Sequence, residues 1–590
     1  MLTRKTNMAL MPEHIDVAHV ASGYTIYPFH SLGEGKVLSG YESLANWIIE
    51  QKTVVIDGYG GVFWNNIKAG LANEFEKKQV LVRWYESAEY LKDESEIEVL
   101  TNSFLGDQHS VWGTKTTLEL HDFFRLNELE KINPDNSCDI NIVIGVGAYL
   151  VNWDFPLIYI DLAKNELQYR MRAGSITNLG KAIAENPVIM YKRFYFIDWV
   201  VLNKHKESLL RKMSVIADAQ WVNSINWAIS ANVFSGLQKL SKSVFRVRPW
   251  FDAGAWGGQW IKKHVQQLNQ DEINYAWSFE FIVPENGLVF ESDGNLLEIS
   301  FDFLMFSAYQ SVLGQHAEQF KTEFPIRFDF LDTFDGGNLS IQCHPSLKYI
   351  QETFGETITQ DETYYILDCK EDAVVYLGFQ ERIEPDKFRQ VLEESVADGK
   401  EVDIEQYVQI HPAKRHDLFL IPNGTIHSAG TNNLVLEISA TPYIFTFKIY
   451  DWLRMGLDGE PRPINIEHAF KNLNFDRKGA KVVEELISKP VIVEEGIDWK
   501  LIHLPTHAEH FYDIHRIEFT SEFIVVNENI CHVLMLVEGS SIAIETADGT
   551  KAVFNFAETF VVPAAAKGYK LINKGEGIAK VVKAFLKTAG

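Results

Sequence analysis

Two patterns of apolar positions divide the chain near residue 240. Before this point, short runs such as 53–58, 140–144 and 157–161 are apolar at most positions, and stretches with helical spacing lie between them. Strands that are buried on both faces of a parallel sheet have this continuous apolar character. The alternation of such runs with helices predicts a doubly wound α/β domain over residues 1–240.

Beyond about residue 245 the pattern becomes rich in short strands. We expect a mostly β domain over residues 245–490 and a final all-β unit over residues 491–590, which includes a hairpin at 539–553. Spaced apolar positions before this region also predict a helical stretch over about 200–245, which would join the two halves of the chain.

A glycine-containing loop, Asp57-Gly58-Tyr59-Gly60-Gly61, follows the first apolar run. A working P-loop continues to a lysine for the phosphates and a hydroxyl for magnesium. Counting from Gly58, this chain has Phe63, Trp64 and Asn65 at the last three positions. The region resembles a nucleoside-kinase-like P-loop domain that has lost its phosphoryl-transfer residues. We therefore expect a glycine turn between strand and helix, whereas an active kinase would bind ATP through this loop.

Composition narrows the classes of function. The 590 residues carry 55 Lys and Arg against 80 Asp and Glu, a net charge of −25. This balance argues against broad nucleic-acid binding, which needs a basic surface, although a local cluster of donors could hold an anionic sugar phosphate. The four cysteines lack a paired spacing and are expected to be reduced thiols in a cytoplasmic protein. No run of about 20 apolar residues occurs, so no membrane span is predicted.

Four side chains have the chemistry of a metal site. Gln342 and His344 lie two residues apart, so on a strand both point to the same side. Glu362 precedes the β-rich run 363–367, and His427 follows a Pro-x-Gly turn that could deliver its imidazole at the start of a strand. Two histidines, a glutamate and an amide oxygen suit zinc or another divalent ion. The alternative is two strand histidines hydrogen-bonded inside a barrel.

These segments, in this order, resemble the type I mannose-6-phosphate isomerases, a zinc-dependent cupin family. The similarity continues through residues 433–438 and the motif Tyr450-Asp451-Trp452, and it includes Ala255-Trp256-Gly257-Gly258 upstream. It covers about residues 245–590. The resemblance implies a bicupin, with two β-barrels and a helical insertion at about 383–408, that interconverts mannose 6-phosphate and fructose 6-phosphate.

The resemblance also assigns site residues. One Zn²⁺ per chain would be held by four ligands: Gln342, His344, Glu362 and His427. Glu437 matches a glutamate near the sugar, a candidate acid or base, and Lys448 and Arg454 are candidate catalytic cations, Lys448 standing where the family usually has an arginine. Ser340 stands at a position associated with phosphate contact. From the residues alone, Glu437 could also be a buried paired acid, and Arg454 could brace a turn through Asp451.

Two departures from the family pattern bear on the substrate. The family's lysines for substrate or phosphate are replaced here by Asp329 and Gln360. Losing two cations weakens the case for a phosphorylated substrate, although other basic residues could compensate: Arg327, Lys348 or Arg462. The alternatives are an isomerase or epimerase of another sugar, which need not be phosphorylated, and a sugar-sensing protein without turnover.

The last unit is expected to form a second barrel without a metal. Its edge resembles a cupin, but Ala566 and Lys567 stand near where a histidine ligand would be expected. Five histidines, at positions 503, 507, 510, 515 and 532, follow no ligand spacing. We therefore expect scattered core or surface histidines there.

Overall fold

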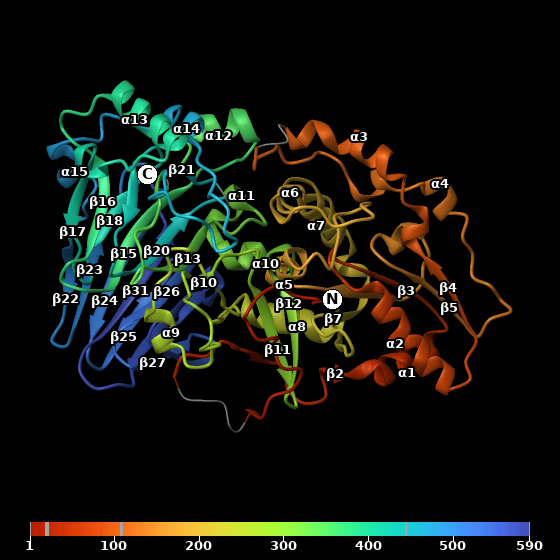
Figure 1. Ribbon diagram of the computed structural model, residues 1–590. Coiled ribbons are helices and arrows are strands. Elements are labelled where there is room, and N and C mark those ends of the chain that lie inside the picture. The colour runs from red at the N-terminus through yellow and green to blue at the C-terminus, as the bar shows by residue number, and fades with distance from the viewer. Residues whose placement is uncertain (1, 18–22, 107–109, 443–444, 589–590) are drawn as a thin grey trace. The chain divides into compact units, whose positions relative to one another are not determined.

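The computed structural model describes residues 2–17, 23–106, 110–442 and 445–588. Their contacts group into two compact units, and the described strands gather into six sheets (Figure 1). The N-terminal unit comprises residues 1–21, 27–240 and 284–309. The C-terminal unit comprises residues 22–26, 241–283 and 310–590.

A seven-stranded sheet forms the centre of the N-terminal unit. Its strands, in spatial order, are β2 (Leu38–Ser39), β8 (Asn226–Ile229), β7 (Met213–Asp218), β6 (Leu157–Asp161), β3 (Thr53–Gly58), β5 (Ile140–Ile144) and β4 (Val82–Glu86). The five strands from β7 to β4 pair in parallel, and β8 and β2 continue the sheet antiparallel. Strands β3, β5 and β6 are buried at every position, which explains their continuous apolar runs.

One stretch of this unit corrects the helical connection expected over residues 200–245. The helix α7 (Trp199–Leu209) ends, and β7 and β8 follow before α8 (Ser230–Leu240) begins. Val215 and Ile216, which have helical spacing in the sequence, are fully buried in β7 against the parallel strand β6. Pairing with a strand distant in sequence has overridden the local periodicity.

The N-terminal unit also includes residues from beyond its main segment. Strands β11 (Gly287–Ser292) and β12 (Asn295–Ser300) form a hairpin that pairs in parallel with β1 (His30–Ser31). The excursion 284–309, which includes the start of α10 (Asp302–Leu313), therefore groups with the N-terminal unit, although the sequence boundary was expected near 245. The unit's other helices are α1 (Gly40–Gln51), α2 (Trp64–Lys77), α3 (Glu94–Leu105), α4 (Leu126–Leu129), α5 (Lys164–Arg172) and α6 (Pro187–Arg193).

Two sheets of the C-terminal unit share one apolar core and form the first sandwich. One sheet contains, in order, β18 (Leu418–Ile421), β15 (Asp361–Cys369), β20 (Asn433–Ala440), β13 (Ile326–Asp332), β10 (Trp277–Phe281) and β9 (Trp250–Asp252). The other contains β17 (Val408–Pro412), β16 (Val374–Phe379), β19 (His427–Ala429), β14 (Ile341–Cys343) and β21 (Phe447–Tyr450).

Two further sheets share a separate core and form the second sandwich. One contains β22 (Val491–Glu495), β23 (Trp499–Leu504), β24 (Tyr512–Phe519), β31 (Ala579–Leu586), β26 (His532–Glu538) and β29 (Thr559–Val562). The other contains β25 (Glu522–Val526), β30 (Gly568–Asn573), β27 (Ser541–Thr546) and β28 (Lys551–Asn555). All neighbouring strands described in both sandwiches are antiparallel, so side chains alternate between core and outer face.

Helices connect and flank the strands of the C-terminal unit. These are α9 (Trp260–His264), α11 (Ala317–Phe320), α12 (Leu347–Phe354), α13 (Pro385–Asp398), α14 (Ile466–Phe470) and α15 (Ala480–Glu485). The helix α13 lies in the stretch where the helical insertion was expected, and it begins with proline, whose fixed φ suits the first turn. Its acidic residues are mostly exposed, as expected for a solvated face.

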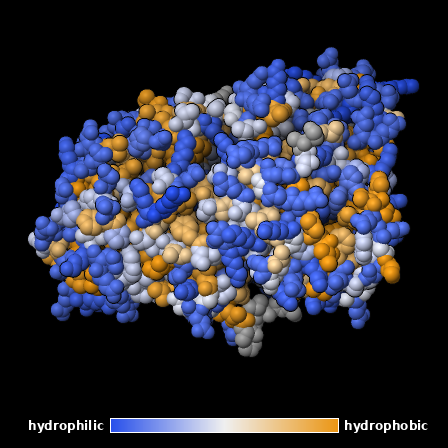
Figure 2. Space-filling view, turned by 180° about the vertical axis from the view of Figure 1, so that it is seen from behind, coloured by the Kyte–Doolittle hydropathy of each residue, from blue (hydrophilic) through white to orange (hydrophobic). Residues whose placement is uncertain are grey.

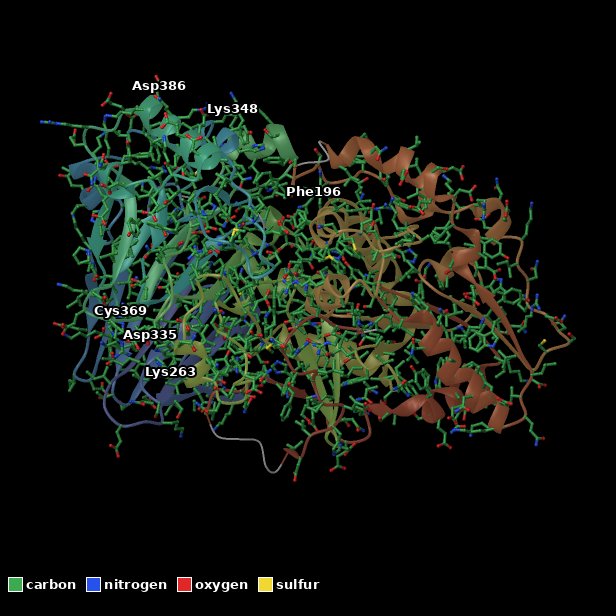
Figure 3. All side chains as sticks on the ribbon, viewed as in Figure 1. Phe196, Lys263, Asp335, Lys348, Cys369 and Asp386 are labelled. Carbon is green, nitrogen blue, oxygen red and sulfur yellow. The ribbon has the colours of Figure 1, made fainter. Side chains whose placement is uncertain are left out.

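The outer surface carries mainly polar side chains, with apolar side chains scattered between them on the face seen in Figure 2. Surface charges often pair: Lys263, which is labelled with Asp335 in Figure 3, contacts Asp335, and Lys370 contacts the same carboxylate. Exposed pairs of this kind contribute little to stability, because the solvent screens their charges. Within the described ranges, no helix is both long and apolar enough to cross a membrane.

Candidate metal centre

Two cross-strand rows in the first sandwich bring the candidate ligands together. In one sheet, Gln342 on β14 pairs directly with His427 on β19. In the other sheet, Glu362 on β15 lies opposite Ser439 on β20. His344 follows β14 by one residue. Ligand atoms of His344, Glu362 and His427 all lie within 4.8 Å of one another, and all three residues are buried.

Both histidines hold one ring nitrogen on the backbone and turn the other toward Glu362. His344 Nδ1 lies 3.1 Å from the carbonyl oxygen of Phe445, and His427 Nδ1 lies 2.9 Å from that of Thr425. A ring N–H donated from Nδ1 to a carbonyl leaves Nε2 as the free lone pair, which is the usual arrangement of a metal-binding histidine. Burial lowers the pKa of His427, which keeps the ring in the neutral form that a metal requires.

Glu362 completes the group of ligand atoms. Its Oε1 lies 2.9 Å from His344 Nε2, and its Oε2 lies 3.4 Å from His427 Nε2. Gln360 Nε2 donates to Oε1 at 2.5 Å and orients the carboxylate.

The donor set fits a divalent cation. Among the described residues, His344 Nε2 and Glu362 Oε2 are buried and have no hydrogen-bond partner, a costly state unless something binds there. Two imidazole nitrogens and one carboxylate leave a coordination position open, as catalytic zinc sites do. The amide of Gln342 lies 3.3 Å from His427 Nε2 and stands beside this set as a potential fourth ligand.

A cavity of about 410 Å³ adjoins the group. Its walls carry three cations and three carboxylates, together with hydroxyl, amide and aromatic groups. The charged residues are Arg327, Asp329, Glu362, Glu437, Lys448 and Arg462. A volume of this size holds a small metabolite, and the mixed polar wall suits a hydroxylated one.

Glu437 and Asp329 lie directly opposite each other in the cavity wall. They are paired across β20 and β13, and Tyr364 on β15 continues the row. Burial, followed by the charge of the neighbouring carboxylates, raises the pKa of both acids well above their ordinary values. Such a pair shares protons readily, because two carboxylates this close resist ionising together.

Lys448 shares the row of Gln342 and His427, since it pairs with Gln342 across β21 and β14. Burial, together with Arg462 and Arg454, lowers the pKa of Lys448 to about 8. Ser340 also lines the cavity and lies 3.3 Å, hydroxyl to amide oxygen, from Gln342. These two predicted site residues therefore share the cavity with the candidate ligands.

Arg454, in contrast, does not line the cavity. Its guanidinium donates to the carbonyl of Asn338 at 2.8 Å and pairs with Asp451. Asp451 also binds Arg462, at 2.7 Å. The geometry therefore corresponds to the brace that was the alternative interpretation of Arg454. Of the residues that could replace the missing lysines, Arg327 and Arg462 line the cavity, whereas Lys348 is exposed on α12 and pairs with Glu352 (Figure 3).

Sequence reasoning missed several lining residues. Trp277 and Phe279 form an aromatic wall on β10, and their rings lie 6.2 Å apart. Ser439 follows Glu437 by two residues on β20 and therefore faces the same way. The spacing of Glu437 and Ser439 could have been used to predict this from the sequence. The aromatic wall could not be predicted, because it depends on the pairing of β10 with β13, which no local pattern indicates.

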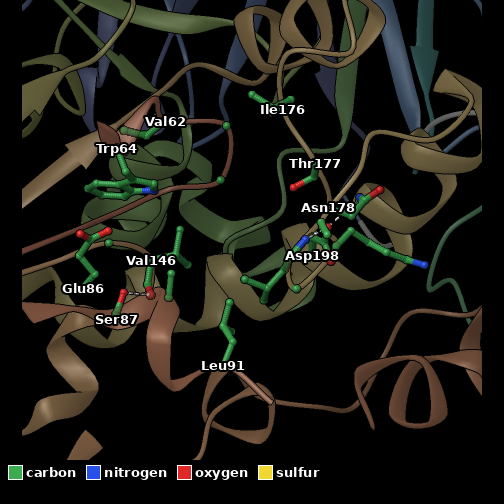
Figure 4. Close-up of a pocket in the computed structure, with 18 of the residues that line it drawn as sticks. Val62, Trp64, Glu86, Ser87, Leu91, Val146, Ile176, Thr177, Asn178 and Asp198 are labelled. Carbon is green, nitrogen blue, oxygen red and sulfur yellow. Dashed lines mark hydrogen bonds between the residues drawn. The ribbon is translucent and has the colours of Figure 1, made fainter. Parts of the chain in front are cut away.

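The N-terminal unit contains a larger cavity, of about 760 Å³, at the carboxyl ends of β3, β4 and β5 (Figure 4). This is where open α/β sheets usually bind ligands. Two of its lysines are matched by acids, because Lys68 pairs with Glu86 and Lys181 pairs with Glu94 and Glu98. Trp64, at a position where a P-loop has its lysine, lies on the wall.

The glycine loop beside this cavity is fixed by Asp57. The Asp57 carboxylate accepts backbone N–H groups of Gly58 at 2.7 Å and Gly147 at 2.9 Å, and it contacts His205 Nε2 at 2.8 Å. Asn178 donates to Asp198 at 2.7 Å, and Asp198 is the last residue of a π-helical turn (Phe194–Asp198) between α6 and α7 (Figure 4). The cavity thus combines a hydrogen-bonded glycine loop with several paired charges.

Comparison with known proteins gives a family model, relatives in sequence and similar solved structures. The model of a family described as a domain of unknown function (DUF8485) matches residues 40–242. The probable mannose-6-phosphate isomerase GmuF of Bacillus subtilis is 30% identical over 179 residues, which are 30% of this chain and 53% of that protein. The mannose-6-phosphate isomerase of Streptococcus mutans is 25% identical over 223 residues, 38% of this chain and 65% of that protein.

The chain thus spans about half to two thirds of the length of these relatives. Among solved structures, the mannose 6-phosphate isomerase from Bacillus subtilis aligns with 58% of this chain and 99% of its own, at a TM-score of 0.47 and 18% identity. A mutant of phosphomannose isomerase from Salmonella typhimurium aligns with 59% of this chain and all of its own, at a TM-score of 0.45 and 14% identity.

Proposed function

We propose that the first sandwich is a metal-dependent aldose–ketose isomerase that interconverts mannose 6-phosphate and fructose 6-phosphate. The observation that carries the proposal is the buried group of His344, Glu362 and His427 beside a polar cavity that also contains a carboxylate pair. The names of the relatives in sequence support the same reaction class.

In this proposal His344, His427 and Glu362 would hold Zn²⁺, with Gln342 as a potential fourth ligand. When bound, the ion would supply positive charge that polarises the sugar oxygens. The protein's own residues prepare this site, since the carbonyls of Phe445 and Thr425 fix the two imidazole rings.

Glu437 is the proposed proton carrier. Its carboxylate takes the proton from C2 of the open-chain aldose and returns it to C1, while the hydroxyl proton on O2 moves to O1. The burial and neighbouring acids that raise the pKa of Glu437 make its carboxylate a stronger base. Lys448, in the row of Gln342, is placed to stabilise negative charge that develops on the sugar oxygens.

Arg462 and Ser340 are the proposed contacts for the phosphate group, with Arg327 on the same wall. A guanidinium suits this role because its planar fork matches phosphate oxygens. Arg454 then acts indirectly, because it holds Asp451, which in turn holds Arg462. Remote binding energy from the phosphate would help to position C1 and C2 for proton transfer.

A coupled assay for fructose 6-phosphate, run with and without a chelator, tests this proposal. We expect turnover that the chelator abolishes and Zn²⁺ restores. The matched control is His411→Ala, because His411 is a buried histidine on β17 of the same sheet, bound to the Leu377 carbonyl and outside the cavity. If the protein binds metal but turns over neither sugar nor sugar phosphate, the result would instead support the alternative of a sugar-sensing protein without catalytic activity.

A second candidate function is isomerisation or epimerisation of an unphosphorylated sugar. Asp329 favours it, since this acid stands in the cavity wall opposite Glu437. An acid there opposes a dianionic phosphate if it is ionised. Comparing kcat/KM for mannose and for mannose 6-phosphate on one preparation separates the two candidates.

A further inference from the structure

The second sandwich becomes polar at one end of its interior. Three successive cross-strand rows run through β23, β24, β31 and β26, and each row lies two residues beyond the previous one. The rows are Leu501–Ile517–Val581–Leu536, then His503–His515–Lys583–Leu534, then Asp513–Phe585–His532. Because the first row belongs to or packs on the apolar core, alternation puts the other two on the same inner face.

Lys583 places a positive charge at this inner end without a carboxylate in ion-pair contact. The residue is 8% exposed, and its ammonium lies 4.8 Å from the ring centroid of Phe585. Within the part of the chain that the structure describes, this ammonium makes no side-chain hydrogen bond or ion pair. The carboxylates that attract it most are Glu528 and Asp513, and neither is within ion-pair distance.

One of these two carboxylates, that of Asp513, is already engaged. Asp513 contacts His503 Nε2 at 2.9 Å and accepts the hydroxyl of Thr506 at 3.2 Å. It also accepts the backbone N–H of Ile514 at 3.0 Å. Glu528 lies on an exposed turn with a positive φ of 49°. Lys583 therefore remains a buried cation whose potential counter-ions are bound elsewhere or solvated, and burying such a charge without a partner is unfavourable.

The groups around Lys583 are neutral hydrogen-bonding side chains. His515 stands directly opposite it, and His515 Nδ1 is buried and has no partner among the described residues. His532 Nδ1 lies 3.0 Å from the hydroxyl of Tyr569. Burial, and then the charge of Lys583, lowers the pKa of His515 to about 4 and that of His532 well below its usual range, so both rings are neutral.

We propose that this inner end of the second sandwich binds the phosphate group of a small metabolite, with Lys583 as its counter-charge and His515 as a hydrogen-bond donor. A phosphate supplies the negative charge that Lys583 lacks, and its several acceptor oxygens match the ammonium, imidazole and hydroxyl donors found there. A metal cation does not fit the same place, because Lys583 would repel it. The proposal is independent of the isomerase reaction.

Calorimetric titration of metal-free protein with inorganic phosphate tests the site. The critical variant is Lys583→Met, which keeps the side chain's length and removes its charge. The matched control is Lys580→Met, because Lys580 lies three residues away on the same strand, faces outward and pairs with Glu538 at 3.2 Å. All variants also carry Arg462→Met, which removes the guanidinium proposed to bind phosphate in the first sandwich.

We expect phosphate to bind the Lys580→Met protein as it binds the parent, and Lys583→Met to weaken that binding at least tenfold. His515→Gln should weaken it by a smaller factor, which covers the case in which Lys583→Met fails to fold. Equal binding by all variants, or no binding by the folded parent, would overturn the proposal. A second titration with an alditol phosphate, which cannot be isomerised, distinguishes a free phosphate site from a sugar-phosphate site.

Discussion

The two sandwiches of the C-terminal unit share one backbone plan but carry different polar groups at one end of their interiors. Each has two sheets around an apolar core, and in each the inward-facing positions become polar toward one end. In the first sandwich, three ligand atoms converge within 4.8 Å and the cavity beside them balances three cations with three acids. In the second, a single lysine faces neutral histidines.

The difference shows that the unpartnered atoms, rather than the strands, define each site. The lone pairs on His344 Nε2 and Glu362 Oε2 have no hydrogen-bond donor, so a bound cation would satisfy them. The ammonium of Lys583 lacks an acceptor and so calls for an anion. If this interpretation is correct, substitutions at the two ends should affect different ligands and should not affect each other.

His344→Ala should produce the largest change, because it removes one of three ligand atoms from the first sandwich. We expect loss of bound Zn²⁺ and a fall in kcat of at least roughly 10²–10³-fold, the scale of losing a main source of charge stabilisation. Elemental analysis and the coupled assay measure the two effects. His411→Ala should retain both metal and turnover, and equal losses in the two variants would show that the damage is structural.

Glu437→Gln should slow the reaction and leave the metal in place. The amide keeps the shape of the side chain but cannot carry the proton between C2 and C1, so we expect kcat to fall by roughly 10²–10⁴-fold. Exchange of substrate hydrogen with deuterated water, followed by nuclear magnetic resonance, should fall in parallel. Unchanged exchange would assign the proton transfer to another group, and Asp329 stands directly opposite.

Features that depend on the local pattern of residues, such as the buried strands and the positions of the candidate ligands, could be predicted from the sequence alone. The runs 53–58, 140–144 and 157–161 become β3, β5 and β6 because full burial demands apolar residues throughout. The parity of Gln342 and His344 and the turn before His427 also place side chains through local geometry, and all three lie in the same site of the structure.

What the sequence could not supply depends on distant pairing. Val215 and Ile216 have helical spacing but lie in β7, because β6 provides a parallel partner. Residues 284–309 group with the N-terminal unit because β11 pairs with β1, more than 250 positions upstream (Phe290 with His30). Lys583 has no motif of its own, and its isolation becomes visible only when the register of β31 with β24 is known.

Lys583→Met should stabilise the protein in the absence of phosphate, at neutral pH. Burial lowers the pKa of Lys583 to about 8 from 10.5, so the unfolded chain binds this proton more tightly. The charged Lys583 therefore lowers the free energy of unfolding. This loss of stability is fully present below pH 8 and disappears as the pH rises through 10.5. We expect the free energy of unfolding of the variant, measured with urea, to exceed that of the parent by up to about 3 kcal/mol at pH 7. Near pH 11 the two values should be equal. A variant less stable than the parent at pH 7 would contradict this, and Lys580→Met is again the control.

Arg462→Met should have the smallest effect and should separate the two candidate substrates of the first sandwich. If the guanidinium binds a phosphate, the variant should raise KM for mannose 6-phosphate by roughly tenfold, the value of one charge-assisted hydrogen bond, and leave KM for mannose unchanged. Arg415→Met is the matched control, because Arg415 is half-exposed, lies outside the cavity and pairs with Glu538 on the second sandwich. An unchanged KM for the phosphorylated sugar would favour the unphosphorylated substrate. It would also leave the second sandwich as the only proposed phosphate site, so that the two sandwiches would differ in the charge of their ligands as well as in their chemistry.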